Sequence, residues 1–300
     1  MRRSLWGSLG PERMIARRQF RNPALAGGLG ALALALGLSA CGVSLGGSSA
    51  PTGRVAEIEP DTTGASAGNI ASLSDVIQRN PNDSVAYNTR GVVYAKIGRY
   101  DNAIADFSKA LQIDPHFAGA YTNRALAYRQ VQKDAQALQD FNQAIVADPA
   151  HAAAYLGRGN LLRAQNQFPD ALADLNQAIK LNPEGAQAYH ARGLIYQRQG
   201  NHPQAITDFN NAIDRDPFAG APYQARGQSL LATGKYDAAI EDFNAALNVD
   251  SNNADGWAGL GLAYEKQGNK AKAAESYQRA LQVSPGNAIA KAGLARLGTA

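Results

Sequence analysis

Hydrophobic and small residues recur with a period of 34 along most of this chain. Prolines stand at positions 81, 115, 149, 183, 217 and 285, and Ser251 occupies the one remaining place in that series. An aromatic residue opens each period, and a glycine or alanine follows it four residues later. A fixed period of this length is typical of stacked supersecondary units.

Two segments of each period have the apolar spacing of a helix. The first segments hold the aromatic residues Tyr87, Tyr121, Tyr155, Tyr189, Tyr223 and Trp257. The second segments hold a small residue and, four residues later, an aromatic residue or leucine, as in Ala103 and Phe107. Small residues allow two antiparallel helices to approach closely, and proline ends the second helix because it cannot donate a backbone hydrogen bond. The pattern therefore predicts an all-α chain of helix-turn-helix units.

This pattern resembles the tetratricopeptide repeat (TPR), with six copies over residues 84–287. The resemblance implies a right-handed α-solenoid, in which each repeat buries its apolar face against its neighbours. Solenoids need caps, and an amphipathic segment adjoins the repeats at each end. We expect residues 69–83 to form an N-terminal capping helix with Ile70, Leu73, Val76 and Ile77 on one face. We expect residues 288–300 to form a C-terminal capping helix that uses Ile289, Leu294 and Leu297.

A different pattern occupies the first forty residues. Arginines at positions 13, 17, 18 and 21 precede an uncharged run of Ala, Leu, Gly and one Ser that extends from Ala24 to Ala40. A basic segment, an apolar segment and a small-residue exit are typical of a secretion signal. The following LSAC resembles a bacterial lipobox, which implies cleavage before Cys41 and lipidation of its sulfur.

The N-terminal interpretation leaves alternatives open. Residues 1–40 are interpreted as a lipoprotein signal peptide, and residues 41–68, rich in Gly, Ser, Ala, Thr and Pro, as a lipidated, disordered tether. An uncleaved transmembrane helix with an incidental cysteine is the alternative. Met14 could replace Met1 as the start, and Arg17-Arg18 resembles part of a twin-arginine export motif beside the general secretion route. The expected location is the bacterial cell envelope, at the outer membrane facing the periplasm, with the inner membrane as the alternative.

Charge and cysteine content exclude several kinds of site. The net charge is +4, but residues 1–40 hold six arginines and one acid, which leaves 23 bases and 24 acids in residues 41–300. A nucleic-acid binder gains affinity from a summed positive field, so no nucleic-acid partner is expected. The single cysteine excludes an internal disulfide and a zinc site made of several thiolates.

Arginine and aspartate recur together in five of the six periods. The columns pair Arg90 with Asp106, Arg124 with Asp140, Arg158 with Asp174, Arg192 with Asp208 and Arg226 with Asp242. The sixth period has Leu260 and Ser276 instead, so the two columns change together. Arg192 and Asp208 lie eight residues on either side of Gly200, at which the turn is centred, so antiparallel packing places them at one height. We predict structural ion pairs within each repeat.

Catalytic patterns are missing from the sequence. The four histidines are scattered, and no two have the spacing of a helical zinc site. The sequence has no glycine-rich phosphate loop and no nucleophile elbow. We therefore predict no catalytic residue, no metal, no cofactor and no enzymatic activity.

The first helices of this family line a concave surface, and some of their polar residues are not needed for packing. The candidate partner-binding residues are Asn88, Lys96, Arg129, Asn160, Arg163, His190 and Arg198. Four of these are bases at nearly the same helical height in consecutive repeats, which favours an acidic peptide or a chain carboxylate as ligand. The alternative is a row of solvated charges that serves solubility.

The resemblances together imply a membrane-anchored periplasmic scaffold or adaptor. Its expected partners are envelope proteins or peptides, bound in the groove, and the membrane itself, bound through the lipid. Roles like those of peptidoglycan-hydrolase adaptors or of pilotins fit this description. The alternative is a self-associating structural scaffold of a periplasmic assembly. The sequence names neither the partner nor the oligomeric state.

Overall fold

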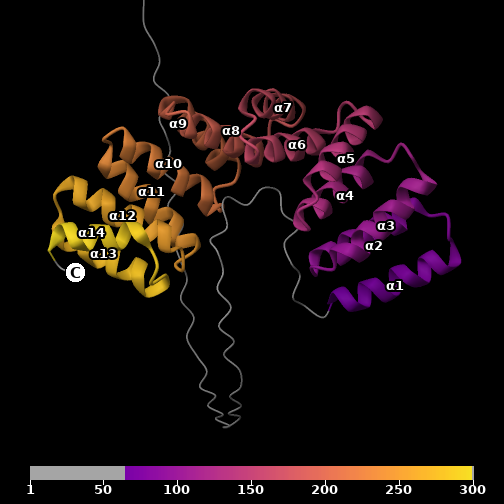
Figure 1. Cartoon of the computed structure of the whole chain (residues 1–300), viewed down its shortest axis with the longest axis horizontal. Helices are drawn as coiled ribbons and strands as arrows, with labels where there is room; N and C mark the ends of the chain where they lie inside the picture. Colours follow the sequence, from indigo (N-terminus) through magenta and orange to yellow (C-terminus); the bar gives the residue numbers. More distant parts are fainter. Residues whose placement is uncertain (1–64, 299–300) are drawn as a thin grey trace, which may run out of the picture. The chain divides into compact units, whose positions relative to one another are not determined.

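The computed structural model describes residues 65–298, which form fourteen α-helices and no β-strand (Figure 1). In chain order these are α1 (Ala65–Arg79), α2 (Ser84–Lys96), α3 (Tyr100–Ile113), α4 (Ala118–Gln130), α5 (Asp134–Ala147), α6 (Ala152–Ala164), α7 (Phe168–Leu181), α8 (Ala186–Arg198), α9 (His202–Arg215), α10 (Gly220–Ala232), α11 (Tyr236–Val249), α12 (Ala254–Gln267), α13 (Lys270–Val283) and α14 (Ala288–Leu297). The signal peptide, Cys41 and most of the tether lie outside the described residues.

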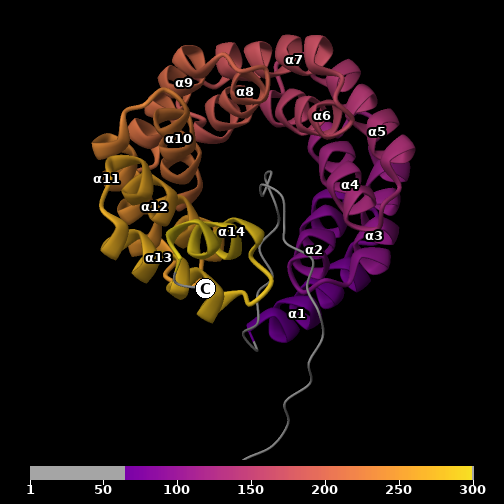
Figure 2. The same cartoon turned by 60° about the vertical axis from the view of Figure 1, so that its left-hand side comes forward.

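Helices α2 to α13 form six hairpins that stack on one another in two layers. The even-numbered helices α2 to α12 lie on the inner side and the odd-numbered helices α3 to α13 on the outer side (Figure 2). The backbones of consecutive inner helices approach closely, whereas within residues 65–298 those of consecutive outer helices stay farther apart. This difference in spacing makes the inner face concave. The all-α tetratricopeptide solenoid expected from the sequence is confirmed.

The core lies between the two layers, where small residues face aromatic rings. In the first repeat Ala103, Phe107 and Ala110 are fully buried. Gly91 allows α2 to approach α3, because a Cβ added there would lie 2.6 Å from Cε1 of Phe107. That distance is well inside ordinary carbon contact. The recurring small residue thus sets how closely the two helices of a hairpin pack.

Each hairpin turns through one residue in the left-handed backbone region. The six residues are Gly98, Gln132, Asn166, Gly200, Gly234 and Gly268. Glycine adopts this conformation without steric cost, whereas Gln132 (φ 59°) does so at a cost. Between repeats, Asp114, Asp148, Asp216 and Asp250 each accept a hydrogen bond from the backbone N–H two residues later. Three of these aspartates precede a proline, which favours extended backbone and ends the helix there.

The two terminal helices differ from the sequence interpretation in detail. Helix α1 begins at Ala65, so the last four residues of the expected tether are helical. Ala65 and Ala67 favour a helical backbone. The N–H groups of a first turn have no partner within the helix in any case, so the helix can extend into these residues. In α14, Leu294 is buried but Ile289 is 48% exposed, so the expectation that Ile289 covers the core is wrong. Ala290, Leu294 and Leu297 form the packed face, and Ile289 lies one helical step outside it.

Candidate functional site

Every arginine of the recurrent column binds the aspartate of its own repeat through two parallel hydrogen bonds. In the fourth repeat, Nε and Nη2 of Arg192 donate to the two carboxylate oxygens of Asp208 at 2.8 and 2.7 Å. The other four expected pairs have the same geometry, at 2.6 to 2.8 Å. The aspartate side chains are only 3 to 9% exposed. The hydrogen bond that Arg192 donates to Asp208 raises the pKa of Arg192, although burial opposes this effect.

The same arginines also reach the preceding repeat, which the sequence analysis missed. Nη1 of each arginine donates to a polar side chain sixteen residues earlier, which lies on α1 for Arg90 and on the outer helix of the preceding repeat for the other four. These acceptors are Ser74, Ser108, Asn142, Asn176 and Asn210. We call the arginine, its aspartate and this acceptor the clamp; each clamp joins three helices. A serine or asparagine at every thirty-fourth position was the available signal.

The inner layer has an uneven charge distribution. Helices α2, α4, α6, α8 and α10 contain no acidic residue, whereas every outer helix from α3 to α11 contains at least two. Besides the clamp arginine, four inner helices carry a second base near their C-terminal end: Lys96, Arg129, Arg163 and Arg198. Bases in a last turn interact favourably with the helix dipole, which explains part of this pattern. The fifth inner helix has Leu231 and Ala232 there instead.

Arg163 differs from the other bases because it is partly buried among positive charges. Burial lowers the pKa of Arg163, and the positive charges of Arg129 and Arg198 lower it further. Its Nε atom is buried and has no hydrogen-bond partner. On the same face of α6, one turn earlier, Asn160 is 2% exposed and its Oδ1 is also buried without a partner. The structure therefore brings Arg129, Arg163 and Arg198 together beside two unsatisfied polar atoms.

His190 lies on α8, next to this group of arginines. Its ring is 5.8 Å from the ring of Phe209, and the two planes are tilted by 51°. Burial lowers the pKa of His190 to about 4, and the charge of Arg163 adds to the effect. His190 is therefore neutral near pH 7 and adds no charge to the site.

The remaining predicted residues lie elsewhere or have other partners. Oδ1 of Asn88 accepts a hydrogen bond from Nδ2 of Asn123 at 3.0 Å, which ties α2 to α4. Lys96 is exposed at the end of α2, two repeats before Arg163. The guanidinium carbon of Arg198 lies 5.9 Å from the ring centre of Phe168.

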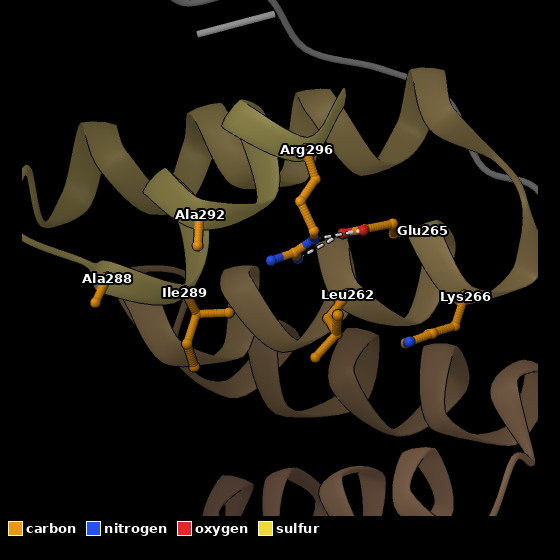
Figure 3. A pocket seen from close by; sticks show the side chains of 7 residues that line it. All are labelled: Leu262, Glu265, Lys266, Ala288, Ile289, Ala292 and Arg296. Atoms are coloured by element: carbon orange, nitrogen blue, oxygen red, sulfur yellow. Dashed lines mark hydrogen bonds and ion pairs between the residues drawn. The ribbon is translucent and has the colours of Figure 1, made fainter. Parts of the chain in front are cut away.

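A hollow lies at the C-terminal end, between α12 and α14. It measures about 560 Å³ and is lined by Leu262, Glu265, Lys266, Ala288, Ile289, Ala292 and Arg296. Figure 3 shows the side chain of Arg296 pointing toward Glu265, and Leu262 and Ile289 lining the apolar part of the hollow. Nε and Nη2 of Arg296 each donate to Glu265 at 2.8 Å. Arg296 and Glu265 in this hollow thus satisfy each other, unlike Arg163.

No other chemistry is evident in the described part. Residues 65–298 hold no group of three His, Cys, Asp or Glu side chains that could bind a metal ion. Within the same residues, no helix has the length and apolar content to cross a membrane.

Family comparisons identify the repeats directly. Models described as TPR repeat or tetratricopeptide repeat match residues 84–117, 118–151, 159–200, 186–218 and 225–288. No curated protein matches the sequence. Tetratricopeptide repeat proteins are generally non-catalytic scaffolds that bind peptides or proteins, and nothing in the described residues indicates an enzymatic activity.

Solved structures share the fold at low sequence identity. The hetero-tetramer Cut9-Hcn1 of the APC/C matches with a TM-score of 0.69 and 21% identity, over 77% of this chain and 46% of that chain. The present chain thus spans about half of that protein. PilW, a type IV pilus biogenesis factor, matches with a TM-score of 0.63 and 19% identity, over 70% of this chain and 98% of that chain. YrrB, a TPR protein with an unusual peptide-binding site, matches with a TM-score of 0.53 and 23% identity, over 62% of this chain and 96% of that chain. With the family matches along the repeats, the chain belongs to the tetratricopeptide repeat proteins.

Proposed function

We propose that this protein is a membrane-anchored periplasmic scaffold that captures a segment of an envelope protein on the inner face of its repeats. The observation that carries the proposal is the separation of charge between the two layers. The inner helices α2 to α10 lack acidic residues and keep bases beyond those used in the clamps. A positive field on this face attracts a partner of opposite charge.

The anchor is proposed from the sequence around Cys41. An apolar run followed by LSAC favours lipidation of the cysteine, and acyl chains hold a protein at a membrane through about 0.8 kcal/mol per buried CH₂ group. The proposed place is the outer membrane, facing the periplasm. A pilotin-like role or an adaptor role for peptidoglycan hydrolases fits such a protein, and the fold shared with PilW supports the first by analogy alone.

The anchor is tested by fractionation of bacteria that express the full chain. We expect the protein in the membrane fraction, with the mass of a lipidated N-terminal cysteine. Cys41→Ser should move it to the soluble periplasmic fraction, because the acyl chains supply the membrane affinity. Ser48→Ala, in the same segment, is the matched control and should stay with the membrane. An unmodified Cys41 thiol on the native protein contradicts the anchor.

The inner face is tested by photo-crosslinking in intact cells. Ala153 on α6 and Ala173 on α7 are both exposed alanines of the third repeat, one on each layer. We expect a photoreactive residue at 153 to give discrete adducts with envelope proteins and the same residue at 173 to give none. Adducts from position 173 alone contradict the proposed face, and adducts only with a second copy of this chain favour the self-associating scaffold.

A further inference from the structure

The position of Arg163 carries an inference that rests on the proposed function and extends it. A buried polar group that lacks a hydrogen bond is unfavourable, and a buried charge more so. Arg163 combines both, since its Nε has no partner and burial lowers its pKa. No acidic side chain within residues 65–298 forms an ion pair with it. The folded protein thus holds an uncompensated positive charge at Arg163, and a bound anion would stabilise it.

The surroundings of Arg163 increase the positive field instead of compensating it. Arg129 on α4 and Arg198 on α8 act on it from both neighbouring repeats, and both are positive. The arginines inside the clamps differ from Arg163, because each is neutralised by its own aspartate. One buried side chain, Asn160, adds an unsatisfied oxygen on the same face of α6.

We infer that Arg163, flanked by Arg129 and Arg198, binds side-chain carboxylates of an extended acidic segment of the partner protein. Carboxylates match the planar donors of arginine, and such charge-assisted hydrogen bonds are stronger than neutral ones. The backbone of the segment lies along the inner face.

Three arginines on three consecutive helices favour several negative charges over one. A chain terminus carries a single carboxylate, whereas an acidic segment supplies several. Nucleic acid fits less well, because residues 41–300 carry 23 bases against 24 acids and lack the summed positive field that phosphate binding uses. An acidic peptide segment is therefore the ligand that best matches the charges of this site.

The test measures binding of a probe to the full lipidated chain in non-ionic detergent. The probe is an acetylated and amidated decapeptide of alternating Glu and Ser, titrated calorimetrically at low ionic strength. We expect Arg163→Gln to weaken binding by roughly tenfold or more, because it removes a partly desolvated charge from the ion pair. Affinity for the unmodified chain should fall as salt is raised, since screening weakens the attraction.

Lys180→Gln is the matched control. Lys180 is an exposed base of the same repeat on the outer helix α7, so its substitution should change affinity by less than roughly twofold. A second readout separates binding from structure. Because Arg163 is unsatisfied in the free protein, Arg163→Gln should raise Tm, by roughly 2 to 4 °C for each kcal/mol gained. A lower Tm together with weaker binding assigns Arg163 a structural role and overturns the inference.

Several other results also overturn it. One is that Arg163→Gln binds the Glu-Ser decapeptide as tightly as the unmodified chain does. Another is that the unmodified chain binds a Gln-Ser decapeptide, either amidated or with a free C-terminal carboxylate, as tightly as the Glu-Ser decapeptide. Equal binding of a single-stranded decanucleotide identifies a general polyanion site instead. If crosslinks from position 153 persist in Arg163→Gln while acidic-peptide binding is unchanged, the inference fails and the proposed function stands. If position 153 gives no crosslink at all, the proposed function itself fails.

Discussion

The first five repeats and the sixth solve the same packing problem with different chemistry. In repeats one to five, a clamp arginine joins the aspartate of its own repeat to a serine or asparagine of the preceding unit. In the sixth, Leu260 and Ser276 take the two clamp positions and are 3% and 4% exposed. An apolar residue and a small hydroxyl residue therefore fill the same space. The clamp is one way to stack a repeat, and burial alone is another.

The sixth repeat uses its charges at the end of the stack instead. Tyr277, which occupies the aromatic column, donates a hydrogen bond to Glu265, and Glu265 also accepts from Arg296 on α14. In the earlier repeats the aromatic position is phenylalanine or leucine and carries no hydroxyl group. The polar network has thus moved from joining repeats to holding the terminal helix. This comparison shows that position in the stack decides what a column of residues does.

The largest expected effect comes from breaking a central clamp. Asp208→Asn leaves Arg192, whose side chain is 21% exposed, without its carboxylate partner. Loss of one member of a buried pair is strongly destabilising, so the free energy of unfolding should fall by about 3 kcal/mol. Urea unfolding followed by circular dichroism measures the change. Asp214→Asn, an exposed position on the same helix, is the control and should change stability by less than about 0.5 kcal/mol.

Exchanging the clamp residues of the fourth repeat with those of the sixth tests whether the two kinds of packing are equivalent. Arg192→Leu with Asp208→Ser copies the sixth repeat, and we expect it to recover at least half of the stability that Asp208→Asn loses. The reverse pair, Leu260→Arg with Ser276→Asp, should be tolerated, because Asn244 already stands sixteen residues before position 260. A double variant as unstable as Asp208→Asn contradicts the equivalence of the two solutions.

A smaller effect is expected from the network that holds α14. The hydrogen bond from Arg296 lowers the pKa of Glu265 to about 2, against the opposing effect of burial. A lowered pKa means that this stabilisation is complete above the ordinary glutamate range and is lost as the pH falls from about 4 toward 2. Glu265→Gln should cost about 1 kcal/mol, since Arg296 is 49% exposed, and should speed amide exchange in α14. Glu275→Gln, exposed on α13, should leave exchange in α14 unchanged; equal exchange rates in both variants contradict this role of the network.

The smallest effect concerns His190 on the inner face, which has no counterpart in the sixth repeat. Burial and the charge of Arg163 lower its pKa to about 4. The unfolded chain binds a proton near pH 6.5, so stability is complete above that value and declines as the pH falls toward 4. Arg163→Gln should raise the pKa of His190 only part of the way, because burial is the larger cause. NMR titration of the ring checks this, and an unchanged pKa in the variant contradicts the coupling.

Much of the fold and part of the site could be read from periodicity. A column of small and aromatic residues repeated every 34 positions is enough to predict the hairpins and their stacking. The intra-repeat ion pairs could also be predicted. Arg192 and Asp208 flank their turn symmetrically, and the arginine and aspartate columns change type together in the sixth repeat. The contact of the same arginines with the preceding unit was missed. A single-residue column of serine or asparagine carries little signal, and its meaning depends on how far one repeat is rotated against the next.

The inner face required the three-dimensional structure. The sequence placed Lys96, Arg129, Arg163 and Arg198 in one row, as if they were equivalent. The stacked helices make them different, because Arg163 has a buried, unpartnered Nε while two arginines raise the positive field around it. Local pattern determines which residues face inward, since a helix repeats every 3.6 residues whatever lies beside it. Burial, unmet hydrogen bonds and the sum of neighbouring charges come from residues of other repeats, so only the assembled stack decides them.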